Sequence, residues 1–327
     1  MTFLMILVIV LGLGFDLTNG MRDSSNIVAT MISSRSFAPR NAMMITALAE
    51  FAGPFLFGVA VAKTIVESVI GKTTINMFIL VAALAGAIFW NLVTSFLGLP
   101  SSSSHALIGG LVGALVSDAG WHVIQWPGLL RVLIALFTSP IIGFIAGYLI
   151  SQLVAMICFN ATPRINWVFK RAQIFTAIAL GLSYGANDAQ KTMGVIALGL
   201  VTSGYLTSFT IPIWVIAACA GMVALGTVVG ARRLIRTLGS KFYHIRPMDS
   251  FNTQLASSVV ILGSSFLRGP VSTTQVVSST ILGVGAAERA NKVRWGVVQE
   301  IALAWLVTIP TTGLISAGLY WAMSHIW

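Results

Sequence analysis

Long apolar stretches separated by short polar ones run along almost the whole chain. Ten such segments can be marked, at about residues 2–32, 42–62, 77–97, 106–116, 129–159, 174–202, 211–231, 251–266, 271–286 and 295–323. A helix of about 20 apolar residues crosses the hydrocarbon core of a bilayer. The pattern therefore predicts an all-α polytopic membrane protein. The segments after Pro100 and Pro270 are short, so we expect each to be either a tilted span or a re-entrant segment.

Composition agrees with this class and excludes others. The chain is 57% hydrophobic and 9% charged, whereas a soluble domain carries about 25% charged residues. An outer-membrane barrel would show short alternating segments, which this chain lacks. The net charge of +10 does not indicate a nucleic-acid partner, because the basic residues lie in short loops between apolar segments. Such residues orient a chain in the lipid bilayer.

The second half of the sequence repeats the first. A shift of 170 residues lays Pro100 on Pro270 and Gly113 on Gly283, and a shift of 165 lays Asp23 on Asp188. We therefore predict two inverted repeats, residues 1–160 and 161–327, that form one transmembrane domain with broken helices. Polar motifs within the long apolar segments, beginning with the one at Gly20, are the expected places for the breaks.

Loop charges predict the orientation. Loops one, three, five, seven and nine carry 13 Lys and Arg residues, and the even loops carry only Lys63, Lys72 and Arg268. The positive-inside rule places the odd loops in the cytoplasm and both termini outside. Each half then has five crossings, so the second half is inverted relative to the first.

Two polar motifs, residues 20–26 and 185–191, place ionisable groups inside apolar runs. Such a group costs roughly 2.5–3.5 kcal/mol to insert, so it is usually functional. Asn19, Asp23 and Asn26 offer oxygens that hard cations accept, and Asn187 and Asp188 offer the same from the other half. We expect cation binding or coupling here. The alternative is that the acids form structural ion pairs with Arg22 and Lys191.

Two hydroxyl clusters follow prolines and begin Gly-rich apolar segments. A helix N-terminus buried in the membrane is an anion site, and hydroxyls add donors. The candidate substrate-binding residues are Ser101, Ser102, Ser103, Ser104, Ser272, Thr273 and Thr274, with Asn26 and Asn187 beside them. The alternative is that these hydroxyls only cap helices or permit close packing. A cation bound between carboxylate and anion would balance their charges, as in a symporter.

Three further residues are candidates for coupling. Glu50 and Glu300 are expected to be buried acids that act as proton carriers, cation ligands or hydrogen-bond partners between helices. His105 is a possible proton relay, although a lone histidine at a helix start more often makes a fixed hydrogen bond.

These motifs together resemble the PiT family of inorganic phosphate transporters. The resemblance is carried by residues 20–26, 185–194, 100–105, 270–274 and 305–310, and it spans nearly the whole chain. It implies a compact prokaryotic symporter of the inner membrane, with external termini and a possible homodimer. The substrate would be inorganic phosphate, moved with H⁺ or Na⁺ or as a complex with a divalent metal. A Na⁺ site would involve Asp23, Asn26, Asn187 and Asp188. Arg22 and Lys191 depart from the family's signature at positions where Asn is expected.

Other functions remain open from the sequence. Some relatives of similar sequence carry sulfate, so a sulfate permease of the same fold is the nearest alternative. A membrane-embedded phosphatase would need a nucleophile beside an Arg or His cluster, and the second loop offers only Gln275 where the first has His105. We therefore expect a transporter with alternating access rather than an enzyme, with no cofactor besides the transported ions.

Overall fold

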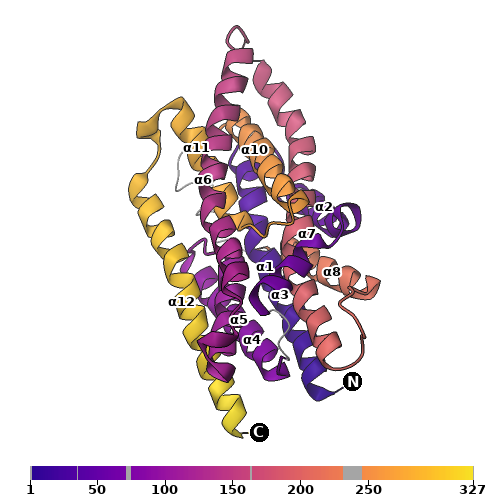
Figure 1. The fold of residues 1–327 in the computed structure, drawn as a ribbon. Coiled ribbons are helices and arrows are strands. Elements are labelled where there is room, and N and C mark those ends of the chain that lie inside the picture. The colour runs from indigo at the N-terminus through magenta and orange to yellow at the C-terminus, as the bar shows by residue number, and fades with distance from the viewer. Residues whose placement is uncertain (1, 35, 71–74, 163, 231–244, 327) are drawn as a thin grey trace.

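The computed structural model describes residues 2–34, 36–70, 75–162, 164–230 and 245–326, and every regular element within them is a helix (Figure 1). The α-helices are α1 (Phe3–Ser33), α2 (Pro39–Phe57), α3 (Ala60–Ile70), α4 (Met77–Leu97), α5 (Ser103–Ala119), α6 (Trp126–Ile157), α7 (Ile165–Thr202), α8 (Ile213–Val229), α10 (Pro247–Phe266), α11 (Thr273–Glu288) and α12 (Trp295–Ile326), with short 3-10 helices η1 (Trp121–Val123) and η2 (Ala290–Lys292). The predicted all-α class is confirmed.

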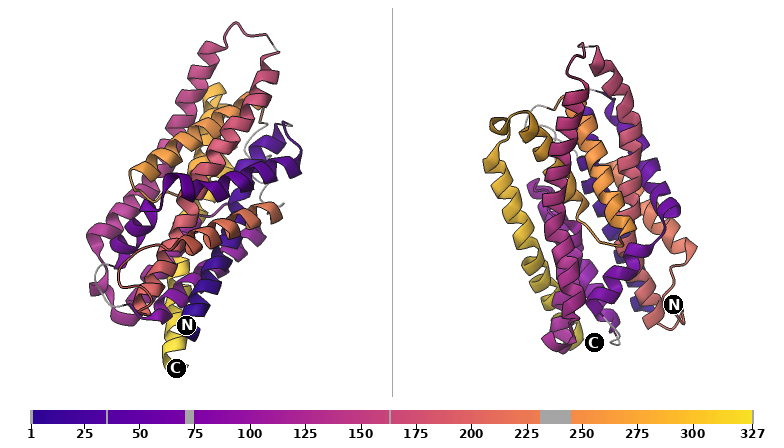
Figure 2. Two further views of the ribbon diagram at one scale, coloured as in Figure 1. Left: turned by 90° about the vertical axis from the view of Figure 1, so that its right-hand side faces the viewer. Right: turned by 45° about the horizontal axis from the view of Figure 1, so that its top comes forward.

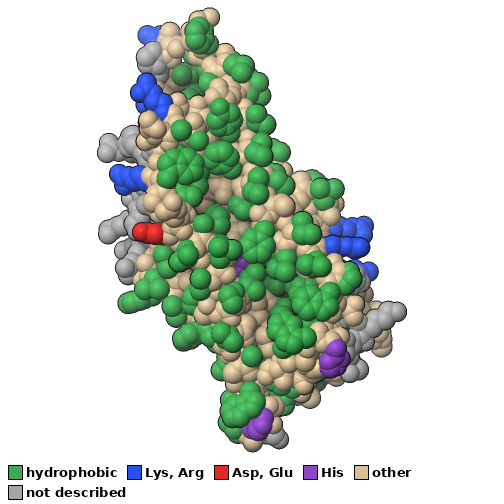
Figure 3. Space-filling model, turned by 60° about the vertical axis from the view of Figure 1, so that its left-hand side comes forward, with side chains coloured by type: hydrophobic (Ala, Val, Ile, Leu, Met, Phe, Trp, Pro, Cys, Tyr) green, Lys and Arg blue, Asp and Glu red, His purple; other side chains and the backbone are tan. Residues whose placement is uncertain are grey.

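The outer helices present apolar side chains to their surroundings. Four helical stretches in the described residues are long and apolar enough to cross a membrane, namely Phe3–Asp23, Met77–Leu97, Trp126–Ile157 and Val298–Ile326. Large apolar side chains such as Ile141 and Leu149 on α6 and Leu314 on α12 are exposed. Figure 3 shows one face on which apolar side chains dominate and Lys and Arg side chains lie at the edges. This surface suits lipid contact, so the chain is an integral membrane protein.

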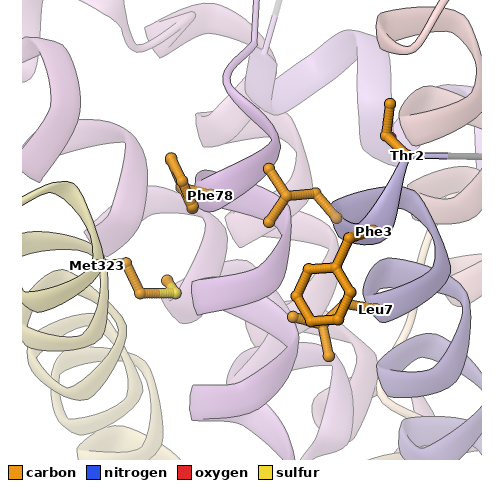
Figure 4. Close-up of a pocket in the computed structure, with 6 residues that line it drawn as sticks. Thr2, Phe3, Leu7, Phe78 and Met323 are labelled. Carbon is orange, nitrogen blue, oxygen red and sulfur yellow. The ribbon is translucent and has the colours of Figure 1, made fainter. Parts of the chain in front are cut away.

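Helices α4 and α5 form a hairpin that starts and ends at the end of the molecule holding both chain termini. Phe78 at the start of α4 lines a pocket of about 300 Å³ with Phe3 and Met323 (Figure 4). At the end of α5, Asp118 accepts a hydrogen bond from the hydroxyl of Tyr320 on α12. Figures 1 and 2 show both termini at this end.

Helices α10 and α11 form a second hairpin from the opposite end. The backbone carbonyl of Pro247 accepts a 2.9 Å hydrogen bond from Nε2 of Gln173, near the start of α7. Arg246, before α10, pairs with Glu288 at the end of α11 at 3.2 Å. The two hairpin tips meet inside the molecule, where Oγ of Ser104 donates to the carbonyl of Val271 at 3.2 Å. The short segments thus re-enter rather than span.

The hairpins correct the predicted topology. Loops three and eight are hairpin tips rather than surface loops, because each hairpin returns to the end at which it began. The first half therefore crosses the molecule three times, by α1, by α2 with α3, and by α6, instead of the expected five. Three is also odd, so the first half still ends opposite the N-terminus, and both chain termini lie at one end of the molecule. Residues 231–244, which hold several of the basic residues counted above, lie outside the described part of the chain.

Gly20 and Gly185 do not break their helices, contrary to the expectation for Gly20. Helices α1 and α7 are continuous through them. A Cβ at Gly20 would lie 2.1 Å from the carbonyl oxygen of Val223, and one at Gly185 would lie 1.9 Å from that of Glu50. Glycine at these positions lets the backbones of two helices approach closely, and such close contact is how apolar helices pack in a membrane.

A helix break occurs instead at Gly58, inside the predicted segment 42–62. Gly58 has φ 77° and separates α2 from α3. Gln190 of α7 bonds the backbone groups that lose their helical partners at this break. Its Oε1 accepts from the N–H groups of Val61 (2.7 Å) and Ala62 (3.2 Å), and its Nε2 donates to the carbonyl of Gly58 at 2.6 Å. Without water, a break is stable only where such a side chain replaces the lost bonds.

The helices pair across the two halves in a reciprocal pattern. Helix α1 packs along α8 and α2 along α7, while α5 packs along α12 and α11 along α6. The glycines at matching repeat positions make these contacts close: Gly113 lies against the backbone of Gly313, and Gly283 lies against that of Phe144. Exchanging each helix for the one at the matching repeat position leaves this set of pairs unchanged.

Candidate functional site

Two adjacent threonines at the start of α11 hold one aspartate from each half. Oγ1 of Thr274 donates to Oδ1 of Asp23 on α1 at 2.6 Å, and Oγ1 of Thr273 donates to Oδ2 of Asp188 on α7 at 2.7 Å. All four side chains are buried. The structure thus brings together, at one helix N-terminus, two acidic motifs and one hydroxyl cluster that lie far apart in the sequence.

Asp188 is also paired with a base. Nζ of Lys191, one helical turn further along α7, donates to Oδ1 of Asp188, and both side chains are almost fully buried. Removing one partner of such a pair leaves an uncompensated buried charge. The ion pair expected as the alternative is therefore present, but it engages only one oxygen of the carboxylate, since Thr273 binds the other.

Arg22 attaches the first hairpin to α1. Its Nη2 donates to the carbonyl oxygen and to Oγ of Ser101, each at 2.7 Å, and its Nη1 donates to Oδ1 of Asn91 on α4. Oγ of Ser101 in turn donates to Oγ1 of Thr94 at 2.9 Å. Ser101, a candidate for substrate binding, is thus part of the hydrogen-bond network at the tip of this hairpin.

The capping alternative holds for one serine in each cluster. Oγ of Ser102 accepts from the N–H of His105 at 3.2 Å, and Oγ of Ser272 accepts from the N–H of Gln275 at 3.3 Å. These caps satisfy one N–H group in the first turn of α5 and of α11. The N–H groups of the first two residues of each helix have no carbonyl acceptor within the helix. These residues are Ser103 and Ser104 in α5, and Thr273 and Thr274 in α11.

The N-termini of α5 and α11 converge. Nδ1 of His105 lies 3.0 Å from Nε2 of Gln275, and these two residues occupy matching positions in the two repeats. Each helix runs away from this contact toward a different end of the molecule. Two positive helix ends, with N–H groups that have no acceptor within their own helix, therefore meet in a buried region that favours an anion electrostatically.

The amide candidates differ in their surroundings. Nδ2 of Asn187 donates to Oγ of Ser265 at 3.2 Å, and its Oδ1 has no partner among the described residues. Asn19 is buried, and neither atom of its amide group has a partner in the described part of the chain. The side chain of Asn26 lies outside what the structure describes.

Glu50 is buried where α2 crosses α8. Its Oε2 accepts a hydrogen bond from Oγ1 of Thr227, and Oε1 has no partner among the described residues. Glu300, by contrast, is exposed, so the expectation that it is a buried acid is wrong. Glu300 lies on the outward face of α12 with Leu303 and Leu306, which are also exposed, whereas the adjacent Ile301 is buried.

Several residues of this region have partners that the local sequence pattern does not indicate. Asn91 and Thr227 are polar residues in apolar helices, bonded to Arg22 and Glu50 at 69 and 177 positions away. Gln190 and Thr192 lie in or directly after the motif 185–191, but the pattern does not show that their partners are Val61 and Asp16. Only Asp16, the partner of Thr192, carries a charge that could have singled it out. Within the described residues no group of three or more His, Cys, Asp and Glu side chains is placed to hold a metal ion.

Comparisons with known proteins agree with these features. The model of the phosphate transporter family matches residues 19–168 and 160–316, one match for each half. A probable low-affinity inorganic phosphate transporter of Bacillus subtilis (strain 168) is 38% identical over 327 residues, covering 99% of this chain and 98% of that protein. A protein of the same description from Rhizobium meliloti (strain 1021) is 41% identical, covering 98% and 96%.

A solved structure shares the fold. It is described as the sodium-dependent phosphate transporter, and it superposes with a TM-score of 0.93 over 100% of both chains at 24% sequence identity. At this level of identity the similarity establishes that the two proteins share a fold.

Proposed function

This chain belongs to the phosphate transporter family, and we propose that it takes up inorganic phosphate by symport with a cation, through alternating access. The family and its relatives are transporters rather than enzymes. The observation that carries the proposal is the pair of hydrogen bonds from Thr273 and Thr274 to Asp188 and Asp23.

Each threonine hydroxyl has one proton to donate. It can donate to its carboxylate or to a phosphate oxygen, but not to both. Phosphate bound at the N-terminal turns of α5 and α11 would therefore take the hydroxyls from Asp23 and Asp188. A cation would then compensate the two carboxylates, because unpaired charges are costly in a buried site. In this mechanism anion and cation bind together.

The phosphate donors we propose are those of the two converging helix starts. They comprise the N–H groups and hydroxyls of Ser103, Ser104, Thr273 and Thr274, while Ser102 and Ser272 cap the helices and Ser101 holds the first tip. Asp23, Asp188, Asn26 and Asn187 would supply oxygens to Na⁺. Asn19 and Glu50, each with a buried oxygen that has no partner among the described residues, are further candidates for coupling.

Alternating access has a structural basis in the two hairpins. The α4–α5 hairpin reaches the site from the end with the termini, and the α10–α11 hairpin reaches it from the other end. We propose that residues 1–160 and 161–327 act as inverted repeats, each moving its hairpin to open one path. Described basic residues such as Arg164, Lys170 and Arg171 lie at the end opposite the termini, so the positive-inside rule makes that end cytoplasmic.

The test is uptake of labelled phosphate into proteoliposomes holding the purified protein. Na⁺ and pH gradients are imposed separately, and sulfate is added as a competitor. We expect accumulation driven by one of the two gradients, inhibition by unlabelled phosphate, and weak inhibition by sulfate. Gradient-driven sulfate accumulation with no phosphate uptake would show that the chain is a sulfate permease instead. Equal rates with no gradient at all would exclude symport.

A further inference from the structure

A second buried carboxylate lies on α1, two helical turns before Asp23. Oδ1 of Asp16 accepts a 2.6 Å hydrogen bond from Oγ1 of Thr192 on α7, and the thiol of Cys219 on α8 also contacts this carboxyl group. Oδ2 of Asp16 has no nitrogen or oxygen partner among the described residues, although the side chain is fully buried. The matching position in the second half is Gly181. Asp16 takes no part in the hydrogen bonds of Thr273 and Thr274 to the aspartates, and it is not among the proposed phosphate donors.

Asn19 lies one turn after Asp16 on the same face of α1, since residues three apart on a helix are neighbours. Its side chain is 1% exposed, and neither its amide oxygen nor its amide nitrogen has a partner in the described part of the chain. Buried polar groups are nearly always hydrogen-bonded, so two adjacent groups with free atoms indicate a missing partner.

The surroundings of Asp16 suit a proton better than a metal cation. Hard cations such as Na⁺ take several oxygen ligands, whereas here the hydroxyl of Thr192 is turned to donate and the next neighbour is a thiol. A proton binds to a single carboxylate oxygen, and the resulting O–H group needs only one hydrogen-bond acceptor. Protonated Asp16 can donate its O–H to Oδ1 of Asn19, which satisfies both free oxygens at once.

No base is bonded to Asp16 in the described residues. On α7 the charged neighbours are Lys191 and Asp188, which are paired with each other. Helix α4 has no titratable residue, and those of α10 and α11, Asp249 and Glu288, lie near Arg246 at the far end. The remaining ionisable groups near Asp16 on the packed helices are Arg22 and Asp23 on α1, Glu50 on α2 and Cys219 on α8.

We infer that Asp16, with Asn19 as its hydrogen-bond acceptor, is a proton-binding site that couples phosphate uptake to a pH gradient. This inference rests on the proposed function. The carboxylate takes up a proton from one side of the membrane and releases it on the other side. When it carries the proton, the carboxyl group is neutral. Thr192 connects it to the substrate region, because the preceding residue on α7 is Lys191, the partner of Asp188.

The test compares accumulation with exchange in proteoliposomes. Exchange of labelled for unlabelled phosphate requires no net proton movement, whereas accumulation driven by an inward proton gradient does. In Asp16→Asn, an isostere of the protonated acid, we expect accumulation to fall at least ~10-fold while exchange stays within ~2-fold of the parent. Asp16→Glu retains a carboxyl group and should accumulate phosphate. Asp118→Asn, at the exposed end of α5, is the matched control and should retain both activities.

Each other outcome is decisive. Accumulation by Asp16→Asn at the parental level overturns the inference, as does loss of exchange in a variant that elutes as folded protein. If Asp16→Asn does not fold, a pH dye trapped in vesicles holding the parent decides: phosphate import without proton import overturns the inference. A parent that exchanges phosphate but accumulates it only with a Na⁺ gradient also overturns it, and leaves the proposed function intact. A parent that exchanges no phosphate fails the proposed function instead.

Discussion

Thr274 and Asp23 are 251 positions apart in the sequence and are joined by a hydrogen bond of 2.6 Å. The bond connects the tip of a hairpin from one end of the molecule to a helix from the other half. The neighbouring bond, from Thr273 to Asp188, connects the same hairpin tip to the second acidic motif, on α7. The two carboxylates thus share one helix N-terminus, and any movement of this hairpin changes the environment of both.

The carboxylates themselves are the first test of the site. Asp23→Asn and Asp188→Asn keep the size of the side chain and remove the charge that a cation would meet. We expect both variants to lose phosphate uptake, and Asp188→Asn also to be less stable, because it leaves the buried charge of Lys191 uncompensated. The measurement is initial uptake in proteoliposomes at matched protein content. Normal transport by both variants would show that the coupling site lies elsewhere.

The threonine donors give a graded test. Thr273→Val and Thr274→Val keep the shape of the side chain and remove a hydrogen bond to a charged oxygen, which contributes about 1.5–3 kcal/mol. We expect the KM for phosphate to rise roughly 10-fold to 150-fold. Thr280→Val, on the same helix, loses bonds only to the carbonyls of Gly143 and Val276 and serves as the control. An unchanged KM in both site variants would remove these hydroxyls from substrate binding.

Removing the contact between Arg22 and the first hairpin should weaken the hairpin tip. Asn91→Leu removes the acceptor of Nη1 and leaves a donor of the buried guanidinium without this partner, at a cost of about 1–3 kcal/mol. We expect a lower unfolding temperature of the purified protein in detergent and slower transport. The neighbouring Leu92→Ala, an exposed position on the same helix, should change neither quantity. Equal unfolding temperatures for Asn91→Leu and the parent would contradict this structural role.

Two glycines of α8 provide a matched pair for helix packing. A Cβ at Gly226 would lie 2.2 Å from the carbonyl oxygen of Leu17 on α1, whereas one at Gly221 would meet nothing within 4 Å. We expect Gly226→Ala to separate α1 from α8 and to give little monodisperse protein in size-exclusion chromatography. Gly221→Ala should be tolerated or slightly stabilising, since alanine favours a helix over glycine by about 1 kcal/mol. Similar elution profiles for the two variants would show that α1 and α8 do not pack this closely.

Orientation is testable with single cysteines. In a chain whose Cys158 and Cys219 are replaced by Ser and Ala, Ala161→Cys lies in the connection between α6 and α7, and Thr2→Cys lies at the other end. We expect an impermeant maleimide added to intact cells to label position 2 and not position 161. A reporter fused after Trp327 should behave as external. The reverse labelling pattern would invert the orientation.

The local pattern of residues was sufficient for the class of the protein and for its main motifs. Continuous apolar segments leave a chain no stable arrangement but helices in lipid, because every backbone group must be bonded within its own helix. Acids and hydroxyl clusters in these segments, such as those around Asp23 and Thr273, are costly enough to mark a functional site. The repeat is predicted from Pro, Gly and Asp residues that recur after 170 or 165 positions.

The three-dimensional arrangement decided which residues these motifs contact. Sequence could not show that Gly20 is a packing contact rather than a break, that Glu300 is exposed, or that Gln190 completes a break at Gly58, because each depends on a neighbour from a distant helix. The choice between spanning and re-entrant segments was also tertiary, since a helix of 16 or 17 residues fits either. Hydrophobicity reports only what a segment costs in lipid or water, whereas the partner of Asp23 is set by which helices cross and where they end.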